Sequence, residues 1–309
     1  MEKIKFYTLL YIDSENQSLS HNGLVDNFHK QIETFVKCCV TLNKSLLFFA
    51  NSEMTVITNN KPYIKNISTD LKCLEIDFNF KIPKDIGFFS AHHKIDVFKY
   101  LSQLDPSQYS VLIDCDILCV NKIPQNLVNC INKNIPVYYD ITDQVYPRYG
   151  RNIITRDKEV LMSGEASNGL WAGGEFMGGD NIFFGLLSDQ IDLIKKDYLD
   201  NYKSLHHQGD EILVSVAIEK IMNQMYICNA GSFGGIRRYW SDQIWRSQYN
   251  LNCYKDDFLL HLPADKKFIA ELSIVDTSLM VSYKKYLWRI SLWIVMKKII
   301  KSTLKYKKH

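Results

Sequence analysis

The chain has 309 residues, 46% of them hydrophobic, with only 7 Pro and 14 Gly, so it can bury a large core and is neither disordered nor of low complexity. Its 37 Lys and Arg against 34 Asp and Glu give a net charge of +3, but nine of the basic residues follow residue 280, where no acidic residue occurs. The first 280 residues therefore carry −6 and the tail +9. An acidic body excludes a general nucleic-acid binder, so no nucleic-acid partner is expected.

The length predicts one large α/β domain, residues 1–280, followed by a basic tail, residues 281–309. The eight cysteines form no C-x-x-C pair, which indicates reduced thiols of an intracellular protein. No apolar stretch with a small-residue cleavage site follows the first methionine, so no secretory signal is expected.

Strand-like and helix-like segments alternate in the first half. We expect strands at 6–12, 45–50, 54–58, 71–78 and 109–113, and helices at 24–43 and 92–101. This alternation predicts a mainly parallel sheet with helices on its faces. Ligands of such sheets bind beyond the carboxyl ends of the strands, where Asp13 and Asp114 fall.

The second half has weaker periodicity. Residues 140–180 are rich in Gly, Asp and aromatic residues, which predicts loops that shape a site. Helical spacing returns at 210–221, with Asp210 and Glu211 in the first turn, where the helix dipole favours anions.

The strongest chemical signal is Asp114-Cys-Asp116, directly after the buried strand 109–113. Two carboxylates at this spacing can reach one divalent cation and leave coordination positions for phosphate oxygens. A solvated strand end is the plainer interpretation, but the strand before the motif and the apolar patch after it favour the metal site.

Later motifs carry weaker signals. His261 could offer a nitrogen to a metal and Lys267 could reach a diphosphate, although a lone His beside a strand is more often structural. The segment Gly173-Gly174-Glu175-Phe-Met-Gly-Gly179 could let a sugar or diphosphate lie close to the backbone, or adopt positive φ angles. The plainer interpretation is a tight hairpin that needs glycine in its turns. The plain interpretation of Asp210-Glu211 is a capped helix with favourable charge.

Together these motifs resemble GT-A fold glycosyltransferases that use nucleotide-sugar donors. The D-x-D motif and His261-x-x-Ala-x-x-Lys267 are similar to the D-x-D and H-x-x-G-x-x-K-P-W motifs of family-8 enzymes, with Ala264 for Gly and Phe268 for Pro. The Gly-rich segment and His207-Gln-Gly-Asp-Glu211 look more like family-6 enzymes. Both families are retaining and metal-dependent, and the resemblance covers roughly residues 5 to 270.

The resemblance implies a role for each matching residue. Asp114, Asp116 and His261 would bind Mn²⁺ or Mg²⁺, and Glu211 would be the nucleophile or oxocarbenium stabiliser with Asp210 beside it. The expected donor and acceptor contacts are Tyr11, Asp13, Lys94 (with His93 as alternative), Asp140 (with Asp143 as alternative), Gly173, Gly174, Glu175 and Lys267. Loop Asp residues such as Asp140 are more often turn formers.

In the tail, apolar residues from Trp288 to Leu304 fall on one side of a helical wheel and lysines on the other. The apolar stretch is too short to span a bilayer, so we expect a helix that lies on an anionic membrane surface. A helix that packs on the acidic body is the competing interpretation.

The sequence thus predicts a cytoplasmic glycosyltransferase, peripheral on the cytoplasmic face of the inner membrane. It would move a hexose from a UDP-sugar to a glycan or glycolipid acceptor in bacterial lipopolysaccharide or capsule synthesis, with retention. Two alternatives stay open: an inverting GT-A enzyme with Asp210 or Glu211 as base, and a non-catalytic, membrane-associated sugar-binding module.

Overall fold

The computed structural model describes residues 3–13, 27–241, 248–273 and 275–306, with the side chains of 293–295 and 297–306 left out. Its strands are β1 (Ile4–Leu10), β2 (Met54–Thr58), β3 (Lys72–Glu75), β4 (Tyr109–Ile113), β5 (Ile117–Cys119), β6 (Val137–Asp140), β7 (Ala172–Gly179), β8 (Cys228–Asn229), β9 (Ile236–Arg238) and β10 (Leu259–His261). Its α-helices are α1 (Phe28–Ala50), α2 (Lys61–Ile67), α3 (Lys94–Leu101), α4 (Gln125–Asn132), α5 (Thr142–Tyr149), α6 (Arg151–Leu161), α7 (Asn181–Asn201), α8 (Asp210–Met222), α9 (Lys266–Glu271) and α10 (Leu279–Tyr306). Short 3₁₀ helices are η1 (Phe89–His93), η2 (Tyr202–Ser204), η3 (Ala230–Phe233) and η4 (Leu251–Tyr254).

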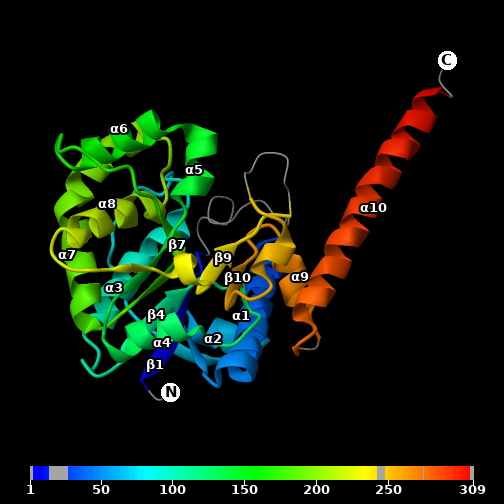
Figure 1. Cartoon of the computed structure of the whole chain (residues 1–309), viewed down its shortest axis with the longest axis horizontal. Helices are drawn as coiled ribbons and strands as arrows, with labels where there is room; N and C mark the ends of the chain where they lie inside the picture. Colours follow the sequence, from blue (N-terminus) through cyan, green and yellow to red (C-terminus); the bar gives the residue numbers. More distant parts are fainter. Residues whose placement is uncertain (1–2, 14–26, 242–247, 274, 307–309) are drawn as a thin grey trace.

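In the described part of the chain, seven strands form a sheet in the order β3-β2-β1-β4-β7-β6-β8. Most neighbouring pairs are parallel; β7 runs antiparallel to both β4 and β6. Figure 1 shows α3, α7 and α8 on one side of the sheet and α1 with α9 on the other. The α/β fold with a mainly parallel central sheet, expected from the alternation of elements, is confirmed.

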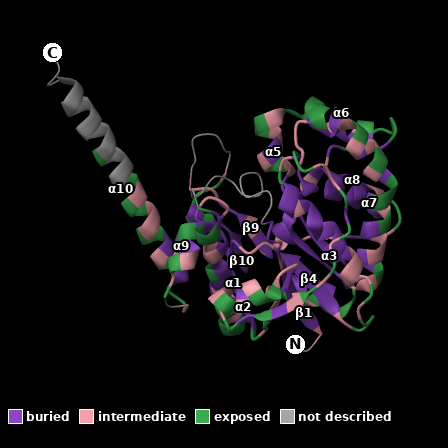
Figure 2. Cartoon of the chain, turned by 180° about the vertical axis from the view of Figure 1, so that it is seen from behind, coloured by how far each residue is buried: buried purple, intermediate pink, exposed green. Residues whose placement is uncertain are grey.

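A second, three-stranded sheet extends the body, with the strand order β5-β10-β9. β10 pairs antiparallel with β5 and parallel with β9. The buried residues of both sheets and their helices form the interior in Figure 2. All eight cysteines are free, in agreement with the expected thiols.

The expected strand at 45–50 is wrong, because α1 continues through it to Ala50. Leu46 extends the buried stripe of Cys39 and Leu42 at helical spacing, so tertiary burial favours the helix. The helix ends where Asn51 adopts a left-handed conformation and its backbone N–H bonds to the carbonyl of Leu46. Residues 24–26 of the predicted helix lie outside the described residues.

The loops expected over 140–180 are also largely wrong: α5, α6 and β7 occupy most of that range. The Gly-rich segment is β7, every residue of which is buried, and its glycines have no positive φ. Glycine is needed there for space, because a Cβ on Gly178 would lie 2.9 Å from Val137 Cγ2. The strand predicted at 71–78 is shorter, from Lys72 to Glu75.

Candidate active site

A cavity of about 250 Å³ opens beyond the carboxyl ends of β1 and β4. This is where a parallel sheet places its ligands. Of the residues predicted from the sequence, its lining includes Tyr11, Lys94, Asp114, Asp116, Gly174, Asp210, Glu211 and His261. The other predicted residues, Asp13, Asp140, Gly173, Glu175 and Lys267, lie outside that lining.

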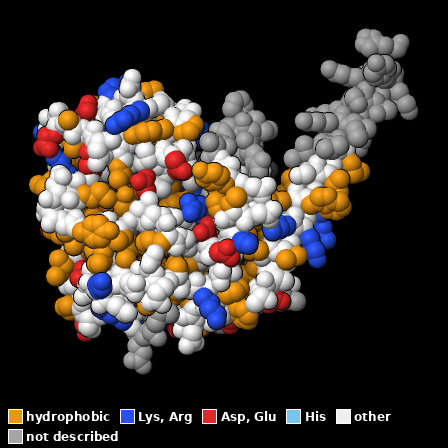
Figure 3. Space-filling view, viewed as in Figure 1, with side chains coloured by type: hydrophobic (Ala, Val, Ile, Leu, Met, Phe, Trp, Pro, Cys, Tyr) orange, Lys and Arg blue, Asp and Glu red, His pale blue; other side chains and the backbone are white. Residues whose placement is uncertain are grey.

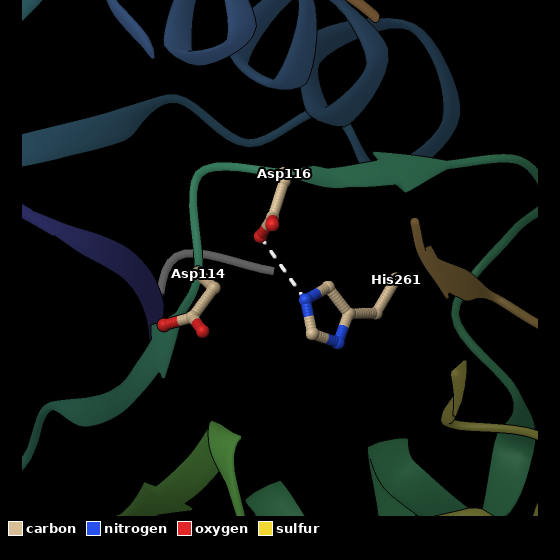
Figure 4. A group of neighbouring side chains, drawn as sticks. All are labelled: Asp114, Asp116 and His261. Atoms are coloured by element: carbon tan, nitrogen blue, oxygen red, sulfur yellow. Dashed lines mark ion pairs between the residues drawn. The ribbon is translucent and has the colours of Figure 1, made fainter. Parts of the chain in front are cut away.

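Asp114, Asp116 and His261 form a cluster that could hold a metal ion, since one donor atom from each lies within 4.8 Å of the others. Asp114 follows β4 and Asp116 precedes β5. The antiparallel register of β10 on β5 sets His261 opposite Ile117, the neighbour of Asp116. Figure 4 shows Asp116 directed toward His261, whose Nε2 lies 3.1 Å from Asp116 Oδ1, and Asp114 beside the pair.

The donor set of this cluster suits a divalent ion. Two carboxylates and one imidazole are ligands that such ions accept. Behind the ring, Glu175 Oε1 lies 3.2 Å from His261 Nδ1. A carboxylate on the far nitrogen fixes the ring of a metal-binding histidine and leaves the other nitrogen for the metal. The residues present therefore fit a metal ion.

Glu175 was expected beside the sugars, but it is 1% exposed and faces His261 and Arg238 instead. Side chains alternate along β7, so Gly174 and Glu175 turn to opposite faces of the strand. Gly174 lines the cavity and Glu175 supports it from behind.

Arg238, at the end of β9, is a site residue that the sequence analysis missed. Its guanidinium donates to both oxygens of Glu175, at 2.7 and 2.5 Å, and to Glu211 Oε1 at 2.7 Å. The residue is 9% exposed and lines the cavity. Its signal in the sequence is a basic residue within the short Ile236–Arg238 strand, before the buried Tyr239.

Glu211 lies in the first turn of α8 and keeps its charge. Besides Arg238, the indole Nε1 of Trp171 donates to Glu211 Oε2 at 3.0 Å. Burial opposes ionisation of Glu211, but Arg238, His207 and Trp171 together outweigh it and hold the pKa of the carboxyl below its ordinary value.

Lys94 begins α3 and joins two acidic groups of the site. Its ammonium group lies 2.8 Å from Asp114 Oδ1 and 3.2 Å from Asp210 Oδ2, and it donates to the Gly174 carbonyl at 2.8 Å. Burial works against the charge on Lys94, yet Asp114 and Asp210 raise its pKa above the ordinary value. Lys94, which the resemblance implies as a donor contact, thus lies beside the metal motif.

The lysine beside the metal cluster is Lys266, not Lys267. Lys266 Nζ lies 2.5 Å from Asp116 Oδ2 and the residue is 8% exposed. The side chain of Lys267 is 84% exposed and lies 4.0 Å from Glu271. Successive residues of α9 point about 100° apart, so a shift of one position separates a site residue from a surface residue.

Asp116 and His261 favour their charged forms through each other and their neighbours, whereas burial raises the pKa of Asp114. Burial opposes ionisation of Asp116, but Lys266 and His261 hold its pKa well below the ordinary value. Burial would lower the pKa of His261, but Asp116 and Glu175 raise it to about 9. Cationic groups thus offset the burial of Asp116.

Tyr11 lines the cavity near β1, and its ring stacks on His93 with centroids 3.9 Å apart. Asp13 is 7% exposed, just past the same strand. Asp140 accepts from the backbone and hydroxyl of Thr142 at the start of α5, which is the turn-forming role typical of aspartate.

No protein-family model matches the sequence, and no curated protein matches it. Among solved structures, the chain is similar to the galactosyltransferase LgtC, crystallised in complex with donor and acceptor sugar analogs. The identity is 8%, the alignment covers 90% of this chain and 99% of LgtC, and the TM-score is 0.50. An active-site mutant of LgtC gives the same values. Mouse xyloside xylosyltransferase 1 aligns at 11% identity over 83% of this chain and 96% of its own, with a TM-score of 0.47. The chain has the GT-A type fold.

Proposed function

We propose that the protein is a metal-dependent glycosyltransferase that moves a hexose from a UDP-sugar to a glycan or glycolipid acceptor, with retention of configuration. The observation that carries this proposal is the single cavity that joins Asp114, Asp116 and His261 to Asp210 and Glu211. Donor cleavage needs positive charge at the diphosphate and negative charge near the anomeric carbon. The GT-A type fold and the donor and acceptor analogs bound to LgtC support the assignment of substrates.

Asp114, Asp116 and His261 would hold Mn²⁺ or Mg²⁺, which supplies positive charge to the diphosphate when bound. Lys266, beside Asp116, would neutralise the phosphates, which is the role that the resemblance implies for Lys267. Lys94 would contact the donor, since it already joins Asp114 to Asp210 across the cavity.

Glu211 would stabilise the positive charge that develops on the sugar. A general base works best with a pKa near 7, whereas the pKa of Glu211 is lowered. This supports an ionised stabiliser or nucleophile over Glu211 as the base of an inverting enzyme. NMR of the anomeric linkage in the product tests retention directly, and an inverted linkage would point to Asp210 as base.

The test of the enzyme assignment is nucleotide-sugar hydrolysis with Mn²⁺, without acceptor. We expect the wild type to hydrolyse UDP-sugars and Asp116→Ala to lose at least about a hundredfold, because Asp116 is a proposed metal ligand. Asp70→Ala, at an exposed aspartate outside the cavity lining, is the matched control. Equal rates in both variants would refute Asp116 as a metal ligand, and a wild type that hydrolyses no nucleotide sugar would favour a non-catalytic sugar-binding module.

Thermal unfolding with UDP-, GDP- and CMP-sugars tests the donor, because a ligand of the native state raises its apparent stability. We expect UDP-sugars with Mn²⁺ to raise the melting temperature most. Stabilisation by GDP- or CMP-sugars alone would refute the donor assignment.

We also propose that residues 281–309 attach the 1–280 domain to the cytoplasmic face of a bacterial inner membrane, for lipopolysaccharide or capsule synthesis. Leu279 and Tyr283 anchor the start of α10 in a buried cluster on the body. Beyond them α10 projects from the body, and Figure 3 shows hydrophobic and basic side chains together on it. Its exposed side chains include Val281, Lys284, Lys285, Trp288, Arg289, Leu292 and Met296.

Val281, Trp288, Leu292 and Met296 share one face of the helix, and Lys285 lies on the same face. The side chains of Trp293 and the later tail lysines lie outside the described residues. Within the described part of the chain, none of the helices combines the length and apolar character needed to cross a bilayer.

Co-sedimentation with vesicles tests the membrane proposal. We expect the protein to bind vesicles that contain phosphatidylglycerol, and a variant without residues 285–309 to lose binding. Vesicles of phosphatidylcholine alone are the control for charge. Unchanged binding after deletion would overturn the proposal.

A further inference from the structure

Phe88 is an aromatic residue at the mouth of the cavity whose backbone is strained. It lines the cavity, yet 46% of its surface is exposed. Its φ of 59° lies in the left-handed region, which bulky side chains rarely adopt. Strain of this kind persists where neighbouring groups fix the backbone, and it clusters at ligand sites.

Contacts on both sides fix the backbone at Phe88. Its carbonyl accepts from the Ala91 N–H at 2.9 Å and lies 3.1 Å from His92 Nδ1. Before it, the Gly87 N–H donates to Gln208 Oε1 at 3.2 Å. The segment before η1 is therefore tied to the loop before α8.

The Phe88 ring stacks on His207, with centroids 5.1 Å apart and planes at 29°. Gly209 makes room for the pair, because a Cβ there would lie 2.6 Å from His207 Nε2 and 3.2 Å from Phe88 Cδ2. His207 in turn meets the Trp171 ring edge-on at 5.7 Å. Phe88 is thus the exposed outer layer of an ordered aromatic stack.

This stack adjoins the carboxylate assigned to the transferred sugar. His207 Nε2 lies 3.9 Å from Glu211 Oε2. The neighbouring Phe89 ring faces Tyr11 instead, at 6.3 Å. Two successive aromatic residues therefore serve different regions: Phe89 and Tyr11 lie near β1, and Phe88 lies on the side of Glu211.

We propose that Phe88, backed by His207, is the platform on which the pyranose ring of the acceptor stacks. The inference rests on the proposed function. Pyranose rings present a face of C–H groups that packs against the electron-rich face of an aromatic ring. An acceptor held beside Glu211 brings its hydroxyl to the sugar that Glu211 stabilises.

Kinetics with variants of Phe88 test this platform. The acceptors are methyl β-D-galactopyranoside, methyl β-D-glucopyranoside and methyl α-D-mannopyranoside, with the UDP-sugar that the wild type hydrolyses. We expect Phe88→Gly to raise the acceptor KM about tenfold, or about 1.4 kcal/mol, and the donor KM by less than about threefold. Phe88→Trp keeps an aromatic face and should rescue the acceptor KM.

Two further readouts separate binding from folding. Glycine adopts positive φ without strain, which offsets part of the packing lost with the ring, so Phe88→Gly should melt within about 4 °C of the wild type while its acceptor KM rises. Phe48→Ala, at a similarly exposed phenylalanine on α1 outside the cavity lining, is the matched control. It should leave the acceptor KM unchanged.

Saturation-transfer NMR of the same glycosides measures binding without turnover. We expect signals from the glycoside with the wild type and their loss with Phe88→Gly. Equal acceptor affinity in Phe88→Gly, an equal rise in donor KM, or no glycoside binding to the wild type would overturn the platform. Failure of the proposed function has a different signature, since the wild type would then hydrolyse no nucleotide sugar in the absence of acceptor.

Discussion

Replacing Arg238 by methionine should destabilise the fold strongly, because two buried carboxylates depend on its charge. Glu175 is 1% exposed and receives two hydrogen bonds from Arg238, and Glu211 receives one. The pKa values of both carboxyls are lowered, although burial acts to raise them. The Arg238 guanidinium is the largest of the influences that lower them. Without that guanidinium, His261 is left to support Glu175 and Trp171 with His207 to support Glu211, so much of the desolvation of both groups is uncompensated.

Removing one partner of a buried ion pair costs about 3–5 kcal/mol. With a shift of about 2 °C per kcal/mol for a chain of this size, the melting temperature should fall by about 6–10 °C. The matched control is Arg237→Met: the Arg237 side chain is 27% exposed and makes one ion pair, to Asp257 at 3.2 Å. We expect that control to lose about 1 kcal/mol or less.

Thermal unfolding by circular dichroism and urea titration measure both variants. A double variant, Arg238→Met with Glu175→Met, should recover part of the loss, because apolar replacement of a buried ion pair is often neutral. If Arg238→Met unfolds within about 1 kcal/mol of Arg237→Met, the view of Arg238 as the compensating charge is refuted.

Three other predictions follow from the same geometry. Lys266→Ala should weaken donor binding about tenfold to a hundredfold, because one hydrogen bond to a charged group is lost. Lys267→Ala should leave donor binding unchanged. Titration calorimetry with the UDP-sugar measures both affinities, and equal losses in the two variants would contradict the placement of α9. Gly174→Ala should destabilise the protein, because its Cβ would lie 2.5 Å from Asp210 Oδ2. Gly185→Ala, within α7 and with no neighbour closer than 3.8 Å, should stabilise it by about 1 kcal/mol. Thermal unfolding should therefore show changes in melting temperature of opposite sign, and changes of the same sign would contradict the prediction. Burial lowers the pKa of His92 below 6.5, so the unfolded chain binds the proton first as the pH falls. The free energy of unfolding should therefore decrease below pH 6.5 by at most about 1.4 kcal/mol per pH unit; His92→Gln should flatten that slope, and an unchanged slope would show that His92 is not its source.

Local patterns in the sequence were sufficient for the elements that end at the site. β4 ends at Ile113, as expected, and Asp114 follows it into the cavity. The helix expected at 210–221 is α8, with Asp210 and Glu211 in its first turn. These predictions succeeded because periodicity and strand ends depend on residues close together in the chain.

Short apolar runs were less informative. The run at 45–50 suits a strand or a buried helix, and only its packing in α1 decides between them. Likewise, the Gly-rich segment reads as a loop, but as β7 it is buried between β4 and β6. Burial on both sides is a property of the sheet and leaves no local signature.

By itself, the sequence determined the α/β class, the strand that carries Asp114 and the separation of an acidic body from a basic tail. Only the tertiary structure decided that Arg238 links Glu175 to Glu211 and that Lys266 faces Asp116. The physical reason is distance along the chain: these contacts depend on strand register and helix phase, and a shift of one residue would turn each side chain away from the site.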